Sequence, residues 1–268
     1  MKHAAFFRKH PVFTGKELDI YMSVMGEVGS RAKESLLTYH RKSGHLVPIR
    51  RGLYGVIPPG ADPETYPINP FLVAAKLGGD AVLSHHTALE IYGHAYSVRE
   101  QITYSTSHPV ARFSFRSHIF RGVRVPQALC SAKKENFGVN TVDQSGLEVP
   151  VTSLERTLVD VLDRPDLSGS WEEIYRSLES VQFFDLDRVV EYALLLGNKT
   201  TIAKLGFFLE QHNESLMVAD NHLKSLASNL PRQPHYLENT RRQPGKLIKR
   251  WNLVVPVEVL NRTWGEVI

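Results

Sequence analysis

Side chains that can bond to the edges of nucleic-acid bases recur between Ser30 and Ile57. The first half of this segment, SRAKESLLTYHRKSG, has a helical pattern in which Arg31, Thr38 and Arg41 fall on one face. An arginine can donate two hydrogen bonds to O6 and N7 of guanine, and a threonine can contact a thymine methyl group or a phosphate. These residue types at this spacing indicate recognition of duplex DNA from the major groove.

The second half of the segment predicts a basic hairpin. LVPI and LYGVI are short β-prone runs on either side of Arg50-Arg51-Gly52, a three-residue loop with a glycine for the positive-φ position. Arginines at such a tip can enter a minor groove or bind phosphates. The alternative is a solvated helix and loop without a ligand. The candidate DNA contacts, with the two lysines assigned to phosphates, are Arg31, Lys33, Ser35, Thr38, Arg41, Lys42, Arg50 and Arg51.

The basic charge of the chain is concentrated in this region. The chain has 268 residues and a net charge of +4. Residues 1–60 hold ten lysines and arginines against four acids, whereas the other 208 residues hold 22 against 24. This asymmetry favours a polyanionic partner for the first part of the chain. The alternative is a solvated basic surface, which would give the same distribution of charge along the sequence.

The elements that must position these residues can be predicted in order. Residues 1–10 form a first helix with Phe6 and Phe7 in the core, and Thr14 to Glu17 has the form of a capping box that opens a second helix. Phe13 and Leu18 stand where a hydrophobic staple would form. In the third helix we expect an N-cap at Ser30, a left-handed stop at Gly44, and a packing stripe of Ala32, Leu36, Tyr39 or His40, and Ser43.

This order of elements predicts an α+β protein of two domains. Residues 1–62 are expected to form a winged helix-turn-helix, and the proline-dense stretch from Pro58 to Pro70 to be the linker. Residues 63–268 are expected to form a larger α+β domain with a mainly antiparallel sheet and packed helices. In it we predict a helix over 81–95 with Ser84 as N-cap, strands over 101–107, 111–120, 122–128 and 146–151, helices from Thr152 onward, and a last strand over 251–259 that joins the sheet.

Other side chains that could bind a metal or take part in catalysis are better explained by a structural role. Adjacent histidines such as His85 and His86 point to different sides of a helix, so we expect surface residues rather than metal ligands. Arg156 and Asp160 lie four apart on an apolar helix that a Thr152–Glu155 capping box would open, which indicates a structural pair. The chain has no phosphate-binding glycine loop, nucleophile elbow or zinc-binding helix motif. We therefore predict no catalytic residues, no enzyme activity, no cofactor and no metal.

Composition also limits the compartment. Cys130 is the only cysteine, which excludes an internal disulfide and suggests a reducing environment. There is no apolar run of about 18 residues and no secretory signal, so we expect a cytoplasmic protein without membrane contact. Near the C-terminus, Arg241, Arg242, Lys246, Lys249 and Arg250 form a basic run that is either a flexible surface or a second patch for DNA or an acidic protein.

Three segments resemble one known family. In order they are HLVPIRRGLYGVIPPG, LSHHTALEIYGHA and VPVTSLERTLVDVLDRP, and together they look like the AbiEi antitoxins, also described as transcriptional regulators of viral defence systems. The resemblance covers roughly residues 10–200. It implies a type IV toxin–antitoxin system in which an N-terminal winged helix represses its own operon by binding inverted repeats. It also implies that the C-terminal domain neutralises a separately encoded nucleotidyltransferase toxin.

Two other functions remain open from the sequence. The first is a winged-helix regulator whose C-terminal domain binds a ligand or dimerises, without a toxin. The second is a nucleic-acid-processing enzyme that uses the N-terminal domain only to dock. A repressor reading inverted repeats would place two copies on the DNA, because one module reads one half-site.

Overall fold

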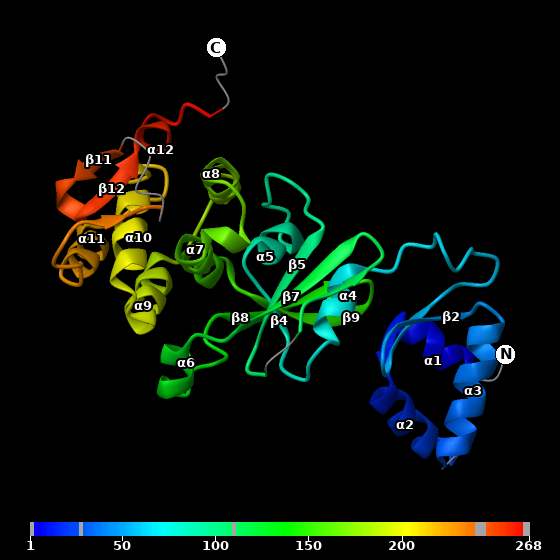
Figure 1. Ribbon diagram of the computed structural model, residues 1–268. Coiled ribbons are helices and arrows are strands. Elements are labelled where there is room, and N and C mark those ends of the chain that lie inside the picture. The colour runs from blue at the N-terminus through cyan, green and yellow to red at the C-terminus, as the bar shows by residue number, and fades with distance from the viewer. Residues whose placement is uncertain (1–2, 27–28, 109–110, 239–244, 265–268) are drawn as a thin grey trace.

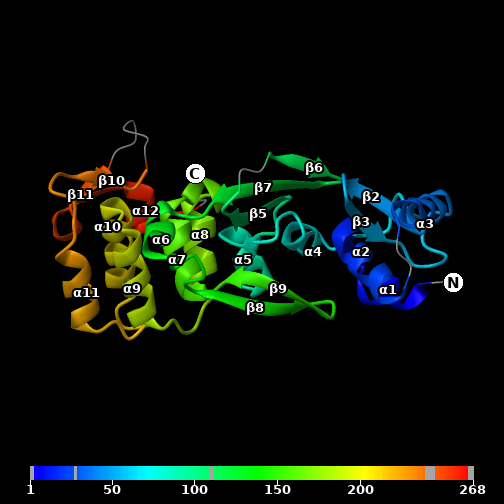
Figure 2. The same ribbon diagram turned by 90° about the horizontal axis from the view of Figure 1, so that it is seen from below.

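The computed structural model describes residues 3–26, 29–108, 111–238 and 245–264. Three parts follow one another along an elongated molecule, with the N-terminal part at one end and the C-terminal part at the other (Figures 1 and 2). Helices and strands are mixed along the chain, which confirms the predicted α+β class. No helix within the described ranges is long and apolar enough to cross a bilayer.

The N-terminal part contains three helices and a three-stranded antiparallel sheet with the strand order β1-β3-β2. Phe6 and Phe7 are buried in its core, as predicted, together with Leu37 of the third helix and Leu46 of the hairpin. In chain order its elements are α1 (Ala4–Lys9), β1 (Val12–Thr14), α2 (Gly15–Val24), α3 (Ser30–Lys42), β2 (Leu46–Arg50) and β3 (Leu53–Val56).

The start of α2 forms as the sequence predicts. The Thr14 hydroxyl accepts a hydrogen bond from the Glu17 amide at 3.2 Å, and the Glu17 carboxylate accepts one from the Thr14 amide at 2.7 Å. Phe13 and Leu18, the expected staple residues, are fully buried in the same cluster. The short strand β1 was not predicted, because three residues are too few to show an alternating pattern.

The packing stripe predicted for α3 is partly correct, because Leu36 packs against the core and His40 is buried. Leu37 and His40 are buried, while Ala32, Tyr39 and Ser43 are exposed. His40 packs edge-on against Phe7 with 4.8 Å between ring centres, and this contact fixes which side faces the core. The helix begins at Ser30 with Gly29 as its N-cap residue and no side-chain cap, so Ser30 is not the cap. Gly44 has the predicted left-handed backbone, with φ of 73°.

The central part is a six-stranded sheet with the order β6-β7-β5-β4-β9-β8. It is mixed: β7–β5 and β4–β9 are parallel, and the other three neighbouring pairs are antiparallel. Its elements are α4 (Pro70–Ala75), β4 (Val82–Leu83), α5 (His86–Ile91), β5 (Gln101–Thr106), β6 (Phe113–Phe115), β7 (His118–Arg124), α6 (Gln127–Ala132), β8 (Val139–Gln144) and β9 (Leu147–Thr152).

Several predicted elements change in this part. The expected helix over 81–95 is a strand followed by a shorter helix, and Ser84 is a buried residue between them rather than an N-cap. The expected strand over 111–120 is a hairpin that turns at Arg116, whose φ is 52°. The expected strand over 122–128 is the end of β7 and the start of α6. Strands β5 and β9 lie within one residue of their predicted ranges.

The C-terminal part is mainly helical, as predicted. Its helix α7 opens with Ser153 as N-cap, whose hydroxyl accepts from the Arg156 amide, so the expected Thr152–Glu155 capping box does not form. The elements are α7 (Leu154–Asp163), η1 (Pro165–Leu167), α8 (Trp171–Glu179), α9 (Leu186–Leu196), α10 (Lys199–Gln211), α11 (Asp220–Ala227), β10 (His235–Tyr236), β11 (Gly245–Ile248), η2 (Lys249–Trp251), β12 (Leu253–Pro256) and α12 (Val257–Asn261).

The last strand joins a second sheet rather than the central one. Strand β12 pairs with β10 and β11 in a separate three-stranded sheet, which corrects the prediction for residues 251–259. This sheet packs on α10 through Trp251, which is fully buried. A Cβ atom at Gly206 of α10 would lie 2.1 Å from Cζ3 of Trp251, so only glycine allows this contact.

The N-terminal part is packed against the central part. Val12, Ile49 and Leu53 belong to the same buried cluster as Leu72 and Val73 of α4. At this junction the linker residue Ile68 covers Gly55 so closely that a Cβ there would lie 2.5 Å from its Cδ1 atom. Residues 63–268 hold two main buried clusters rather than one, because most of the helical part forms a core of its own. The boundary at residue 62 stays a prediction.

Candidate nucleic-acid interface

One side of α3 faces away from the rest of the chain. Arg31, Ser35, Thr38, Arg41 and Lys42 are all exposed there. Within the residues that the structure describes, the three cationic side chains of this set form no ion pair or hydrogen bond, so they are free to bind an external anion. A shallow hollow runs along this face and is lined by Arg31, Glu34, Ser35, Thr38, Tyr39 and Lys42.

The buried side of the helix adds little charge to this surface. Burial lowers the pKa of His40, with smaller contributions from the nearby His45 and His3, and this keeps the imidazole neutral near pH 7. The positive charge of α3 therefore comes from its arginines and lysines. Of the two alternatives that the sequence gave for the packing stripe, His40 is buried and Tyr39, with 64% of its surface exposed, lies on the open face.

Lys33 lies apart from the other candidates on α3. Its ammonium group donates to the Gly15 carbonyl oxygen at 2.9 Å and to Asp19 at 2.6 Å, so it ties α3 to the first turns of α2. An ammonium has three N–H donors, and one remains for a phosphate. Lys33 lines a second hollow together with Arg50 and Arg51 rather than the hollow on the exposed face of α3.

The hairpin tip is held by the start of α2. Arg50 pairs with Leu53 across the ladder, and Arg51 and Gly52 form the turn, with φ of 76° at the glycine. The loop is thus shorter than predicted, and the glycine has the expected conformation. The Gly52 carbonyl oxygen accepts a hydrogen bond from the Gly15 amide at 2.8 Å. Both arginines are exposed, and the Arg50 guanidinium lies 5.6 Å from the centre of the Phe113 ring.

Two lysines beside the hairpin were missed by the sequence reasoning. Lys16 and Lys76 line the same hollow as Arg50 and Arg51. Lys76 also forms an ion pair with Glu17. Burial tends to raise the pKa of Glu17, but hydrogen bonds from Lys76 and Thr14 outweigh it and hold the pKa below its ordinary value. Lys76 follows α4, far from Lys33 in the chain, so no local pattern could have placed the two together.

The histidine pair is interior rather than superficial. His85 and His86 are both buried, which corrects the expectation of surface residues. His85 Nδ1 lies 3.0 Å from the Ser84 hydroxyl oxygen, and His86 Nε2 lies 2.8 Å from the Ser97 carbonyl oxygen. Burial lowers the pKa of His85, which therefore stays neutral. Among the described residues no three candidate ligands lie close enough together to hold a metal.

The Arg156–Asp160 pair is enclosed by hydrogen-bond partners. Arg156 Nε lies 3.3 Å from Asp160, and its guanidinium also donates to the Phe137 carbonyl oxygen at 2.8 Å. The Tyr192 hydroxyl donates to the other Asp160 oxygen at 2.6 Å. Arg156 is 1% exposed, so this pair has no route to a substrate and serves the structure.

The basic run near the C-terminus is only partly described. Arg241 and Arg242 lie outside the described residues. Lys246, Lys249 and Arg250 are exposed, and Arg250 is paired with Glu210. The described part of this run therefore offers two unpaired lysines, far from α3 along the molecule (Figure 1).

A solved structure has a similar fold. No family model matches the chain, and no curated relative does. The fold is similar to that of the RV2827C protein from Mycobacterium tuberculosis, whose crystal structure superposes with a TM-score of 0.63 over 98% of this chain and 93% of that chain. The two sequences are 17% identical, so the similarity concerns the fold alone.

Proposed function

We propose that residues 1–62 form a winged helix-turn-helix that binds duplex DNA, with α3 in the major groove and the β2–β3 hairpin as the wing. The observation that carries this proposal is the open face of α3, where three cations without a partner among the described residues lie among hydrogen-bonding side chains. A helix of 13 residues is about 20 Å long and fits a groove about 12 Å wide. Arg31 and Arg41 would read bases, while Lys42 and the hairpin arginines bind phosphates.

Replacing Arg41 by alanine is expected to weaken binding to the protein's own upstream region by about 1–3 kcal/mol and to relax preference at one base pair. The reason is the loss of a side chain that can bond two atoms of one guanine. Fluorescence anisotropy with a labelled duplex and a set of single-base variants measures both effects. Arg188, an exposed arginine on α9 at the other end of the molecule, provides the matched control. Equal losses for R41A and R188A would contradict the assignment.

Replacing Arg51 by alanine should act differently, because phosphate contacts carry no sequence information. We expect weaker binding to all duplexes and a plot of log affinity against log salt concentration whose slope falls by about one. The measurement is the same titration repeated over a range of salt concentrations. An unchanged salt slope in R51A would exclude the hairpin tip as a phosphate contact.

The resemblance to the AbiEi family supports a more specific form of this proposal. The protein would repress its own operon through inverted repeats, with two copies on the operator, and would act as the antitoxin of a nucleotidyltransferase toxin. The three resembling segments correspond to the hairpin, the β4–α5 segment and the β9–α7 segment. Residues of the last two, including His85 and Arg156, are buried, so their role in such a protein would be to shape the fold rather than to contact a toxin.

The adjacent reading frame tests the antitoxin half. If it encodes a nucleotidyltransferase, coexpression of the full chain should relieve its toxicity, and the two proteins should copurify. A DNA-binding chain that neither rescues growth nor copurifies would leave a regulator without a toxin, whose C-terminal part binds a ligand or a second copy. A specific observation keeps this second candidate: the C-terminal part contains a cavity large enough for a small molecule.

A further inference from the structure

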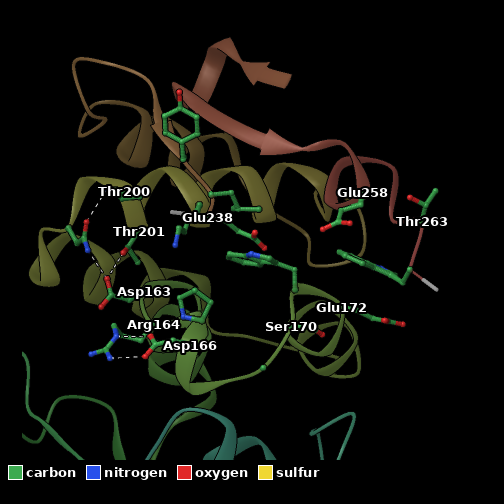
Figure 3. A pocket seen from close by; sticks show the side chains of 18 residues that line it. Asp163, Arg164, Asp166, Ser170, Glu172, Thr200, Thr201, Glu238, Glu258 and Thr263 are labelled. Atoms are coloured by element: carbon green, nitrogen blue, oxygen red, sulfur yellow. Dashed lines mark hydrogen bonds and ion pairs between the residues drawn. The ribbon is translucent and has the colours of Figure 1, made fainter. Parts of the chain in front are cut away.

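A cavity of about 740 Å³ lies in the C-terminal part, far from the proposed DNA-binding face. Its walls come from the end of α7 and η1, the starts of α8 and α10, strand β10 and the segment that includes α12. Figure 3 shows Asp163, Thr200 and Thr201 on one side of it, and Glu258 and Thr263 on the other. This volume falls in the range of sites that hold small organic ligands.

Lys204 of α10 is the buried charge in the wall of this cavity. Its residue surface is 7% exposed, and its ammonium nitrogen lies 5.4 Å from the centre of the Trp171 ring. The ammonium donates to the Leu162 carbonyl oxygen at 3.0 Å, which is its one hydrogen bond within the described part of the chain. Since an ammonium carries three N–H donors, two remain for a partner in the cavity. A buried charge with donors left over is costly unless a ligand or water satisfies them.

The carboxylates beside Lys204 already have donors. Asp163 accepts from the Asn198 side chain at 2.7 Å and from the Thr201 hydroxyl. Asp166 accepts two hydrogen bonds of 2.9 Å from Arg164. On the α8 side, the Glu172 carboxylate is paired with an arginine of the next turn at 2.8 Å. These three carboxylates have donors, although Glu238 and Glu258 also line the cavity, and two N–H donors of Lys204 have no partner within the described residues.

Two helix starts place partial positive charge at the wall of the cavity, whose lining also contains five carboxylates. α8 and α10 both begin at its wall, with Ser170 and Asn198 as their N-caps. The first amides of a helix carry partial positive charge and favour an anion. Glu258, on the opposite side, is exposed and would repel a second anionic group. The arrangement suits a molecule with one anionic end.

We infer that this cavity binds a small molecule through one anionic oxygen group, a carboxylate or a phosphate, which accepts hydrogen bonds from the free N–H donors of Lys204. This site is independent of DNA binding by α3, and either proposal can fail without the other. The charge of Lys204 is sensitive to pH. Burial lowers the pKa of Lys204 to about 8, while the negative charges of Asp163, Glu238 and Asp166 act to raise it. Binding is therefore expected to weaken as pH rises above that value.

The test uses the full chain and two simple probes, inorganic phosphate and acetate, compared with chloride at equal ionic strength. One probe should raise the melting temperature of the wild type, and Lys204→Met should bind it about tenfold more weakly or worse, because a charge-assisted hydrogen bond is lost. Lys199→Met, an exposed change in the first turn of α10, should respond like the wild type. A response to phosphate alone identifies a phosphate ligand, and a response to acetate alone identifies a carboxylate.

A second measurement needs only the wild-type chain. Acetic anhydride transfers an acetyl group to a neutral lysine amine, which loses its proton as acetate leaves, and mass spectrometry locates the product. The effective probe should protect Lys204 and leave Lys199 equally reactive. The inference is overturned if neither probe affects the wild type, if K204M responds as the wild type does, or if Lys204 is not protected.

Discussion

Replacing Arg156 by methionine should lower the free energy of unfolding by about 3–5 kcal/mol, the usual cost of leaving one partner of a buried ion pair alone. Methionine keeps much of the volume but removes every donor of the guanidinium. Among the described residues, Asp160 would then keep only the Tyr192 hydroxyl as a side-chain donor to its buried charge, and the Phe137 carbonyl oxygen would lose the hydrogen bond from Arg156. Urea unfolding followed by circular dichroism measures the loss.

A matched control is present on another helix. Arg176 forms an ion pair with Glu172 at the same spacing of four residues, but its side chain is 43% exposed. Exposed pairs of this kind contribute less than about 1 kcal/mol, so R176M should change stability little. If R156M and R176M cost the same, burial of the Arg156 pair would not be what makes it important.

Replacing Lys204 by methionine should have the opposite sign and raise stability by about 2–3 kcal/mol at pH 7. Burial lowers the pKa of this lysine from 10.5 to about 8, so the charged form is less favourable in the folded chain than in the unfolded chain. A difference of this size corresponds to about 3 kcal/mol, and the lost hydrogen bond to Leu162 offsets part of it. Natural binding sites often carry such a cost.

The stability gained by K204M should also decrease as the pH rises. Below pH 8 both states keep the Lys204 proton, and the full penalty is present in the wild type. Between pH 8 and 10.5 the folded state releases the proton while the unfolded state holds it, so the wild type becomes more stable relative to K204M. The advantage of K204M should therefore shrink over this window and be absent above it. Denaturant unfolding at a series of pH values checks this, and a variant less stable than the wild type at pH 7 would refute the argument.

Much of the N-terminal part could be predicted because its signals are local. The Thr14–Glu17 capping box, the stop at Gly44 and the turn at Gly52 each depend on neighbours in the chain. Local signals could not show which side of α3 packs against the core. Apolar or aromatic residues at 36, 37, 39 and 40 allow two stripes, and contact between His40 and Phe7 selects one of them.

The burial of several polar residues could not be predicted from the sequence, because their hydrogen-bond partners are distant in the chain. His86 Nε2 bonds to the Ser97 carbonyl oxygen and the Thr87 hydroxyl accepts from the Thr103 amide, and both partners lie on other segments of the chain. The cavity was missed for the same reason, since its walls come from four separated stretches of the chain. One signal was present: Lys204 interrupts the run TTIAKLGFFL, where a charged residue in a buried helix needs an explanation.

The first turn of α2 contacts three neighbouring segments, two of the N-terminal part and one of the central part. It holds α3 through Lys33, the hairpin turn through Gly15, and α4 through the pair of Glu17 and Lys76. The N-terminal part therefore cannot swivel freely on a flexible tether. If the N-terminal part binds a repeated DNA site, the rest of each elongated chain would occupy space beside the duplex at each half-site. The permitted distance between two half-sites would then be set by how two full-length bodies fit side by side along the duplex.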